Sequence, residues 1–200
     1  NDQNKINYLK DFSEEKLGKG VIVCGDTPGF LGNRIGVYAM QVAMTEAVKM
    51  DLSIEEADAV FGRPMGIPKT GVFALYDLIG IDLMSDVLKS FQKELAKEDE
   101  FQKVVSGLPI IKKLIETGYT GRKGKGGFYR LNLSSGSKVK ESRDLETGNY
   151  SKSIKPKHLR SVKAAKKGLR ALVEYDDMGG NYAWQVLSKT LSYAASLVPE

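Results

Sequence analysis

Residues 26–36 read DTPGFLGNRIG, and this stretch decides the fold of the residues after it. Thr27 is a good N-cap and Pro28 suits the first helical position, so a helix is predicted from about residue 28 to residue 50. Two apolar stripes cover most of its circumference, at Leu31, Ile35, Tyr38 and Val42 and at Val37, Met40, Met44 and Val48. The pattern indicates a helix that runs through the middle of a core.

The residues before this helix indicate part of an α/β unit. Residues 1–18 are predicted to form a short polar helix that Gly18 and Gly20 end. GVIVCGD at 20–26 then has the compact β-branched run of a buried strand. No GxGxxG loop follows a strand, so we expect residues 1–25 to be the tail of a nucleotide-binding domain whose front half lies outside the chain.

The residues after the long helix predict further helices. SIEEADAVFG at 53–62 begins with a capping box of Ser53 and Glu56, and 63–71 is a predicted loop. Two helical stretches separated by Gly80 come next, followed by another at 109–118. The segment 26–133 is therefore predicted to be one mainly α-helical domain, with a short extended piece at 126–130.

The last third of the chain has a different character. Residues 134–157 are polar and lack a long apolar period, so a linker or surface excursion is predicted. Residues 158–200 resume helical spacing, and Gly179-Gly180 is expected to break it. This predicts a helical hairpin or the opening of a second helical unit.

Composition limits the classes of protein that fit. The single cysteine, Cys24, excludes an internal disulfide and favours a reducing compartment, and no Cys/His cluster predicts a metal site. No signal peptide or membrane-spanning run is seen. The net charge of +5 is concentrated at 121–127 and 153–170. It indicates either a solvated basic face or a site for a phosphate-rich ligand.

Three segments are candidates for chemistry. Asn33-Arg34 interrupts an apolar face near a helix start, where an amide either binds a ligand or ties down a loop. FGRPMGIPKTGVFALYDLIGID at 61–82 has prolines that fix a loop. Its Asp82 is interpreted as a helix cap and its Asp77 as a capped or paired carboxylate. GYTGRKGKGGFYR at 118–130 is either a flexible solvated loop or a phosphate contact.

Together these segments resemble the C-terminal domain of the 3-hydroxyacyl-CoA dehydrogenase family over roughly residues 20–130. The resemblance is carried by DTPGF-x-x-NR, by PMG-x-P running into D-x-x-G-x-D, and by GRK-x-G-x-GFY. One departure is that Lys125 stands where the family has its middle glycine. The resemblance implies a helical domain of the 6-phosphogluconate dehydrogenase C-terminal-like type, preceded by a helix-strand remnant of a Rossmann domain.

The resemblance also implies a reaction, the NAD-dependent oxidation of an (S)-3-hydroxyacyl-CoA to the 3-ketoacyl-CoA in fatty-acid β-oxidation. The family's catalytic histidine and glutamate and its NAD site lie in the nucleotide-binding domain, so the NAD site is expected to be absent from this chain and the fragment alone inactive. The only histidine, His158, matches no part of that motif and is interpreted as structural or surface.

Carried over residue by residue, the resemblance makes Asn33 the candidate catalytic residue. The implied acyl-CoA contacts are Arg34, Pro64, Met65, Gly66, Pro68 and Lys69, and the implied CoA phosphate contacts are Arg122, Lys123 and Lys125. Arg34 is also a candidate to brace an interdomain contact.

The expected partners are acyl-CoA, the missing NAD-binding domain, and either a second copy or a fused enoyl-CoA hydratase domain. The basic segments lack interleaved aromatic residues, which argues against nucleic acid. The expected compartment is the cytoplasm in a bacterium, or the mitochondrion or peroxisome in a eukaryote. An alternative function is a non-catalytic module for acyl-CoA docking and oligomerisation.

Overall fold

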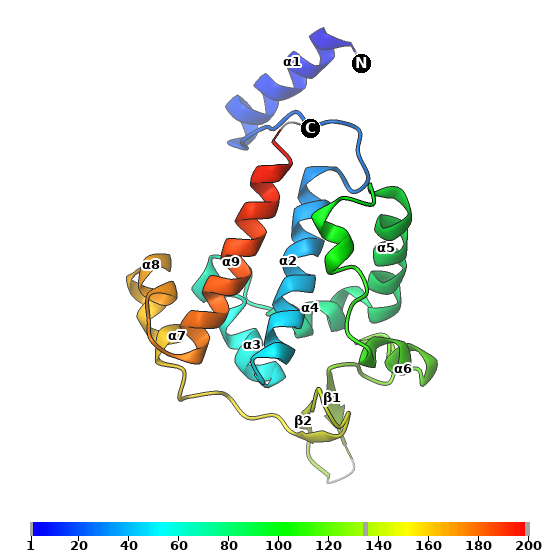
Figure 1. Cartoon of the computed structure of the whole chain (residues 1–200), viewed down its shortest axis with the longest axis vertical. Helices are drawn as coiled ribbons and strands as arrows, with labels where there is room; N and C mark the ends of the chain where they lie inside the picture. Colours follow the sequence, from blue (N-terminus) through cyan, green and yellow to red (C-terminus); the bar gives the residue numbers. More distant parts are fainter. Residues whose placement is uncertain (1, 134–135, 199–200) are drawn as a thin grey trace.

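A computed structural model describes residues 2–133 and 136–198 of the chain. Its fold is mainly α-helical, with one small sheet at one end and helix α1 standing apart from the body at the other (Figure 1). The α-helices are α1 Gln3–Asp11, α2 Phe30–Lys49, α3 Ile54–Val60, α4 Val72–Ile79, α5 Ile81–Glu94, α6 Ile110–Glu116, α7 Arg160–Ala164, α8 Leu169–Val173 and α9 Met178–Ser196. The short helical turns are η1 Phe12–Lys16, η2 Arg63–Met65, η3 Glu100–Lys103 and η4 Ala165–Lys167.

Helix α2 is the central element, as its two apolar stripes predicted. It begins at Phe30 rather than at Pro28, because Thr27 does not cap it. The carbonyl of Thr27 instead accepts the Phe30 N–H at 2.9 Å in a tight turn, and Gly29 takes φ 77° as the N-cap. A Cβ at Gly29 would overlap the ring of Phe91. Tertiary packing therefore sets where this helix starts.

Helices α3 to α6 confirm the local predictions. Ser53 and Glu56 form the predicted capping box at the start of α3, with the Ser53 N–H donating to Glu56 at 2.7 Å. Gly80 separates α4 from α5 at φ 114°, which a residue with a Cβ rarely adopts. The loop predicted at 63–71 contains one 3-10 turn, η2.

The C-terminal segment folds against α2 in the reverse direction (Figure 1). The Tyr182 hydroxyl donates to the Ala43 carbonyl at 3.0 Å, and Lys189 pairs with Glu46 at 2.8 Å. The expected break at Gly179-Gly180 is wrong, because both glycines lie buried in the first turn of α9. A side chain on Gly180 would overlap the Tyr175 carbonyl, so the glycines permit close packing.

The polar segment 134–157, predicted to be a linker or surface excursion, contains two strands in its described part. In its described part lie β2 Val139–Arg143 and β3 Tyr150–Lys152, which join β1 Tyr129–Asn132 in an antiparallel sheet of order β1-β2-β3. The register pairs Tyr129 with Ser142 and Ser142 with Ser151. Cation–π contacts stabilise this sheet where apolar periodicity is lacking, since Arg130 and Arg143 lie 3.9 and 4.1 Å from the Tyr150 ring centroid.

In the N-terminal segment, the predicted helix at 1–18 is confirmed, whereas the predicted strand at 20–26 is not. Helix α1 continues into η1, and Gly18 with φ 61° follows. Residues 20–26 form no strand, because the described structure offers them no partner strand to complete backbone hydrogen bonds. Ile22 and Val23 are consequently 73% and 66% exposed.

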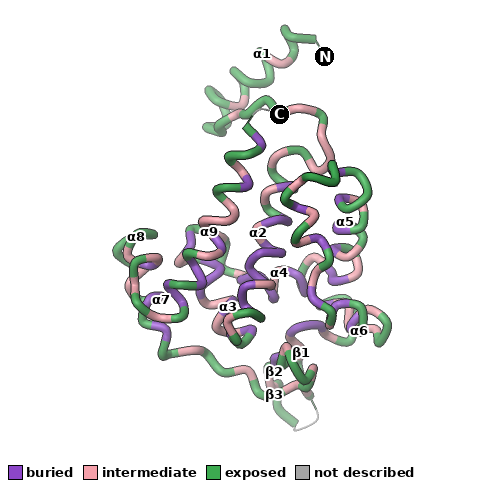
Figure 2. Tube along the Cα trace, viewed as in Figure 1, coloured by how far each residue is buried: buried purple, intermediate pink, exposed green. Residues whose placement is uncertain are grey.

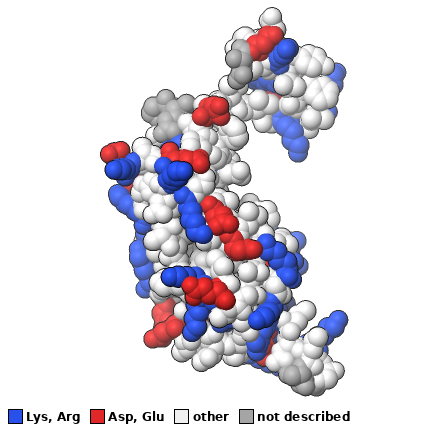
Figure 3. All heavy atoms as spheres, turned by 90° about the vertical axis from the view of Figure 1, so that its right-hand side faces the viewer, with Lys and Arg blue, Asp and Glu red and all other residues white. Residues whose placement is uncertain are grey.

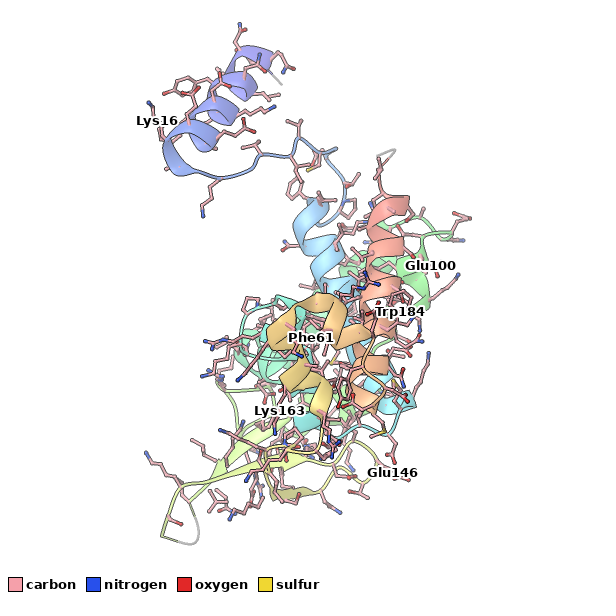
Figure 4. All side chains as sticks on the ribbon, turned by 90° about the vertical axis from the view of Figure 1, so that its left-hand side faces the viewer. Lys16, Phe61, Glu100, Glu146, Lys163 and Trp184 are labelled. Atoms are coloured by element: carbon pink, nitrogen blue, oxygen red, sulfur yellow. The ribbon has the colours of Figure 1, made fainter. Side chains whose placement is uncertain are left out.

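One apolar core joins the long helices, and Figure 2 shows the buried residues concentrated along α2, α4 and α9. Leu159, Leu172 and Tyr182 of the C-terminal segment belong to the same core as Met44 and Phe73. The division of the chain at residues 25, 133 and 157 stays a prediction. Trp184 lies on α9 with 56% of its surface exposed (Figure 4). No described helix has both the length and the apolar character needed to cross a membrane.

Candidate functional site

Asn33 lies exposed in the first turn of α2. The end of α2 that begins at Phe30 is the end nearest α1 (Figure 1). Gly32 and Gly36 beside it are also exposed, and a Cβ added at either would meet no atom within 4 Å. Residues three apart share one face of a helix, so Asn33 and Gly36 lie together on an open surface. This placement suits a side chain that contacts a ligand or another domain.

Arg34, the next residue, is buried. Its Nε donates to the Tyr193 hydroxyl at 2.8 Å, and its guanidinium forms an ion pair with Asp99. The Tyr193 hydroxyl also donates to Asp99 at 3.1 Å. The expectation that Arg34 contacts substrate or braces another domain does not fit this geometry, because its side chain joins α2 to α9 and to the start of η3. The placement points to a structural role.

The Pro64–Lys69 loop contributes to a shallow cleft of about 430 Å³ between η2 and the α7–η4 segment. Pro64 and Lys69 line this cleft together with Arg63 and Lys166. Met65 is buried in the core, and Gly66 is an exposed turn residue at φ 75°. The sequence prediction treated the loop as one surface, and the structure divides it between core and cleft.

Asp77 joins the second sequence motif to the third. Its carboxylate accepts the Phe128 N–H at 2.8 Å and the Tyr129 N–H at 2.7 Å, and its backbone carbonyl accepts the Arg122 N–H at 2.8 Å. A Cβ on Gly127 would overlap the carboxylate. Burial raises the pKa of Asp77 to about 6, although these hydrogen bonds favour the charged form. Asp77, interpreted as a capped or paired carboxylate, thus holds the backbone at the start of β1.

Beside Asp77 lies a cleft of about 550 Å³, which we call the basic cleft. Its lining residues are Ala74, Asp77, Arg122, Gly124, Lys125, Gly126, Tyr129, Arg130, Leu131 and Lys140. Arg122 and Lys125 were predicted phosphate contacts. Lys123 was grouped with them, but it pairs with Asp82 at 2.9 Å and does not line the cleft.

Sequence reasoning missed Arg130 and Lys140 as members of this cleft. Arg130 lies on β1 and Lys140 lies on β2. These two strands pair so that Leu131 of β1 is opposite Lys140. The segment holding Lys140 was interpreted as a linker or surface excursion, so nothing indicated that it returns to the loop at 118–127, which we call the glycine loop. Asp82 was expected to cap a helix, and it lies in the first turn of α5 paired with Lys123.

Asp58 is a further polar residue that the sequence did not single out. Its carboxylate accepts the backbone N–H groups of Phe73 and Ala74 at 2.7 and 3.1 Å, which caps α4 from the neighbouring helix. The Tyr129 hydroxyl also donates to it at 2.9 Å. Burial raises the pKa of Asp58 to about 7. No local pattern marks such a cap, since its partners lie 15 and 71 residues away.

His158, interpreted as structural or surface, lies exposed beside α3. Its Nε2 lies 2.7 Å from Glu56, so it contacts the capping box of α3. In the described residues, no group of three or more His, Cys, Asp or Glu is arranged to hold a metal ion.

The predicted site residues therefore do not form one pocket. Asn33 lies in the first turn of α2, whereas the basic cleft is lined by residues of α4, the glycine loop, β1 and β2. The sheet lies at the opposite end of the body from the start of α2 (Figure 1). The remaining surface shows no large field of one sign on the face in Figure 3, where Lys and Arg alternate with Asp and Glu.

Comparisons with known proteins agree with this architecture. The sequence model of "3-hydroxyacyl-CoA dehydrogenase, C-terminal domain" matches residues 29–131. A Rickettsia prowazekii protein named as a fatty acid oxidation complex trifunctional enzyme is 34% identical over 97% of this chain and 26% of its own length. A Bacillus subtilis "Probable 3-hydroxyacyl-CoA dehydrogenase" is 32% identical over 100% of this chain and 25% of its own length.

A mammalian relative matches a smaller part. The mitochondrial hydroxyacyl-coenzyme A dehydrogenase of Sus scrofa is 31% identical over 64% of this chain and 39% of its own length. The chain thus spans 26% and 25% of the Rickettsia and Bacillus relatives. The matched family domain and these relatives show that the chain belongs to the 3-hydroxyacyl-CoA dehydrogenase family.

Proposed function

We propose that this chain is the substrate-side part of an NAD-dependent (S)-3-hydroxyacyl-CoA dehydrogenase that acts in fatty-acid oxidation. The family membership carries the proposal, and the exposed Asn33 on an open helix face supports it. An asparagine amide both donates and accepts hydrogen bonds, so Asn33 can orient the oxygen of a 3-hydroxyacyl group against a base supplied by another domain.

The residues present do not fit a dinucleotide site. Dinucleotides bind at the carboxyl ends of parallel strands, beside a glycine-rich turn and a helix N-terminus. Before α2 the described chain has only α1, η1 and an unpaired extended segment, and its sheet is antiparallel. We therefore assign NAD binding and the general base to a part of the parent protein that this chain lacks, and we expect the fragment alone to be inactive.

The test is an assay of the full-length parent with acetoacetyl-CoA and NADH. Asn33→Ala is expected to lower kcat/KM by about a hundredfold, the usual effect of removing one positioned hydrogen-bonding group. Asn181→Ala is a matched control, because Asn181 is also exposed and also occupies the fourth position of its helix, α9. Equal turnover of the Asn33 variant and the control would end the role proposed for Asn33.

The Pro64–Lys69 loop remains a proposed acyl-CoA contact, through Pro64, Gly66, Pro68 and Lys69. Arg63→Ala and Lys69→Ala in the parent are expected to raise KM with little change in kcat, because uniform binding is lost. An unchanged KM in both variants would remove this loop from the substrate site.

A second candidate function is a docking and oligomerisation module, which the apolar N-terminal surface favours. Tyr8, Leu9 and Leu17 are 68%, 60% and 56% exposed, in addition to Ile22 and Val23. Exposed apolar residues in such number favour coverage by another domain or copy. Sedimentation of the chain over a range of concentrations tests this, and a monomer at every concentration would count against self-association.

The compartment and assembly belong to the same proposal. We propose a cytoplasmic enzyme if the source is bacterial, and a mitochondrial or peroxisomal one if it is eukaryotic. A parent carrying a fused enoyl-CoA hydratase domain is favoured by the trifunctional name of the Rickettsia relative. The sequence of the parent before residue 1 tests this directly.

A further inference from the structure

The basic cleft draws cations from three separate segments. Arg122 and Lys125 come from the glycine loop, Arg130 from β1 and Lys140 from β2. Glu141 neutralises Arg130 at 2.6 Å. In residues 2–133 and 136–198, no carboxylate lies within the 4.0 Å ion-pair distance of Arg122, Lys125 or Lys140. Lys125 Nζ donates to the Thr117 carbonyl at 3.2 Å, and the Asp77 carboxylate also lines the cleft, so the cleft keeps an excess of cations that a bound anion would offset.

The glycine loop that carries Arg122 and Lys125 is not the flexible solvated loop that the sequence allowed. The Gly121 N–H donates to the Gly126 carbonyl at 2.8 Å, and the Gly124 N–H donates to the Gly121 carbonyl at 3.0 Å. A Cβ on Gly124 would lie 2.5 Å from the Thr120 hydroxyl oxygen, so a larger residue would not fit. The backbone positions of the cations are therefore fixed before any ligand binds, which lowers the entropy lost on binding.

Tyr129 supplies a fixed aromatic wall to the same cleft. Its N–H is held by Asp77 at 2.7 Å and its hydroxyl by Asp58 at 2.9 Å. Lys140 lies over the ring, with its Nζ 3.8 Å from the centroid. Ala74 and Leu131 add apolar surface to the lining. The cleft thus combines an excess of cations over its one carboxylate, Asp77, with an apolar, partly aromatic wall.

We propose that the basic cleft binds a phosphorylated small molecule of the nucleotide class. Its phosphate would lie among Arg122, Lys125 and Lys140, and its planar group would lie against the apolar lining at Ala74 and Leu131. Asn33 lies in the first turn of α2, a helix of 20 residues and about 30 Å, and no residue of α2 lines the cleft. The ligand therefore need not be the molecule that reaches Asn33. Coenzyme A and free nucleotides share this chemistry, and separate probes distinguish them.

Isothermal titration of the 200-residue chain at low salt tests the site with AMP, coenzyme A, inorganic phosphate and uncharged adenosine. AMP is expected to bind more tightly than adenosine, and added salt to weaken AMP binding. Arg122→Ala or Lys140→Ala is expected to weaken AMP binding by about tenfold or more, since a hydrogen bond to a charged group contributes about 1.5–3 kcal/mol.

Lys123→Ala is the matched control, because Lys123 is adjacent in sequence but pairs with Asp82 outside the cleft. Its affinity for AMP is expected to stay within about twofold of wild type, given the small contribution of an exposed pair. Circular dichroism of each variant verifies folding, and Arg122→Lys provides a milder change at the same position.

Each outcome decides the proposal. Binding of coenzyme A but not AMP, with the same dependence on Arg122 and Lys140, supports the site and assigns it to coenzyme A. Binding of both supports a general nucleotide-phosphate site. No saturable binding of AMP, coenzyme A or phosphate overturns the proposal, as does equal binding by adenosine or by Arg122→Ala. The Asn33 assay is independent of all these results, so the two proposals can fail separately.

Discussion

Arg34 in the first turn of α2 donates to the hydroxyl of Tyr193 near the end of α9, at 2.8 Å and across 159 residues of sequence. Asp99 completes this buried group by pairing with Arg34 and accepting from Tyr193. The turn that presents Asn33 is therefore fixed by the C-terminal helix, which lies beyond the matched family domain at 29–131.

Removing the Asp99 carboxylate is expected to lower the free energy of unfolding more than removing the Tyr193 hydroxyl. Asp99→Ala removes the carboxylate that forms an ion pair with the buried Arg34 guanidinium and should lower the free energy of unfolding by about 3 kcal/mol or more. Tyr193→Phe should lower it by about 1 kcal/mol. Urea denaturation measures both, with Lys89→Ala in the exposed Lys89–Asp86 pair as the control. An Asp99→Ala loss no larger than that of the control would contradict this account.

The stability of the chain is expected to fall as pH rises from about 4 to about 7. Burial raises the pKa of Asp58 from 3.8 to about 7 and that of Asp77 from 3.8 to about 6. Because the folded state holds these protons at a pH where the unfolded state has lost them, each group contributes a slope of up to about −1.4 kcal/mol per pH unit within its window.

Urea unfolding at a series of pH values tests this, and Asp58→Asn should flatten the slope between about pH 5 and pH 7. The exposed Asp176→Asn serves as the control. A slope that Asp58→Asn leaves intact would assign the pH dependence to other groups.

Gly36→Ala is expected to raise the stability of the chain and to lower the activity of the parent enzyme. Gly36 is exposed within α2 and has open space around its Cβ position, so alanine should stabilise the isolated chain by about 1 kcal/mol through helix propensity. In the parent enzyme the same methyl group would occupy the surface beside Asn33 and should lower turnover with acetoacetyl-CoA. A variant that is both more stable and fully active would show that this face is not used in the reaction.

Deleting residues 158–200 is expected to abolish cooperative unfolding, because Tyr182, Val186 and Leu172 would leave the core. Deleting residues 1–17 is the matched control, since α1 and η1 contain no buried residue. Thermal unfolding followed by circular dichroism compares the two deletions. A cooperative transition in the C-terminal deletion would show that residues 158–200 form a separate unit.

Local signals predicted much of the helical fold. The capping box of Ser53 and Glu56 and the break at Gly80 depend on residues within a few positions of each other, and both are confirmed. The start of α2 was misplaced because the ring of Phe91, far along the chain, helps to fix the turn at Gly29. Strands β2 and β3 were missed because cation–π contacts to Tyr150 replace the apolar alternation that predicts a strand.

The sequence predicted only those residues of the candidate site that lie together in one motif. Arg122 and Lys125 are close in sequence and do line a cleft. Lys140 reaches the same cleft only through the pairing of β1 with β2, and Asp58 reaches Tyr129 across 71 residues. Neither contact can be predicted from the residues next to it in the sequence. The separation of Asn33 on α2 from the basic cleft, which no residue of α2 lines, likewise required the fold.

Trp184 is the single tryptophan of the chain, and it lies on α9 with 56% of its surface in solvent. Its fluorescence therefore reports on one known surface without labelling. A domain or second copy that covers this side of α9 should shift the indole emission to shorter wavelength, whereas a partner bound at α1 should leave the spectrum unchanged. The chain thus contains its own optical probe for locating the surface through which it joins the rest of its parent.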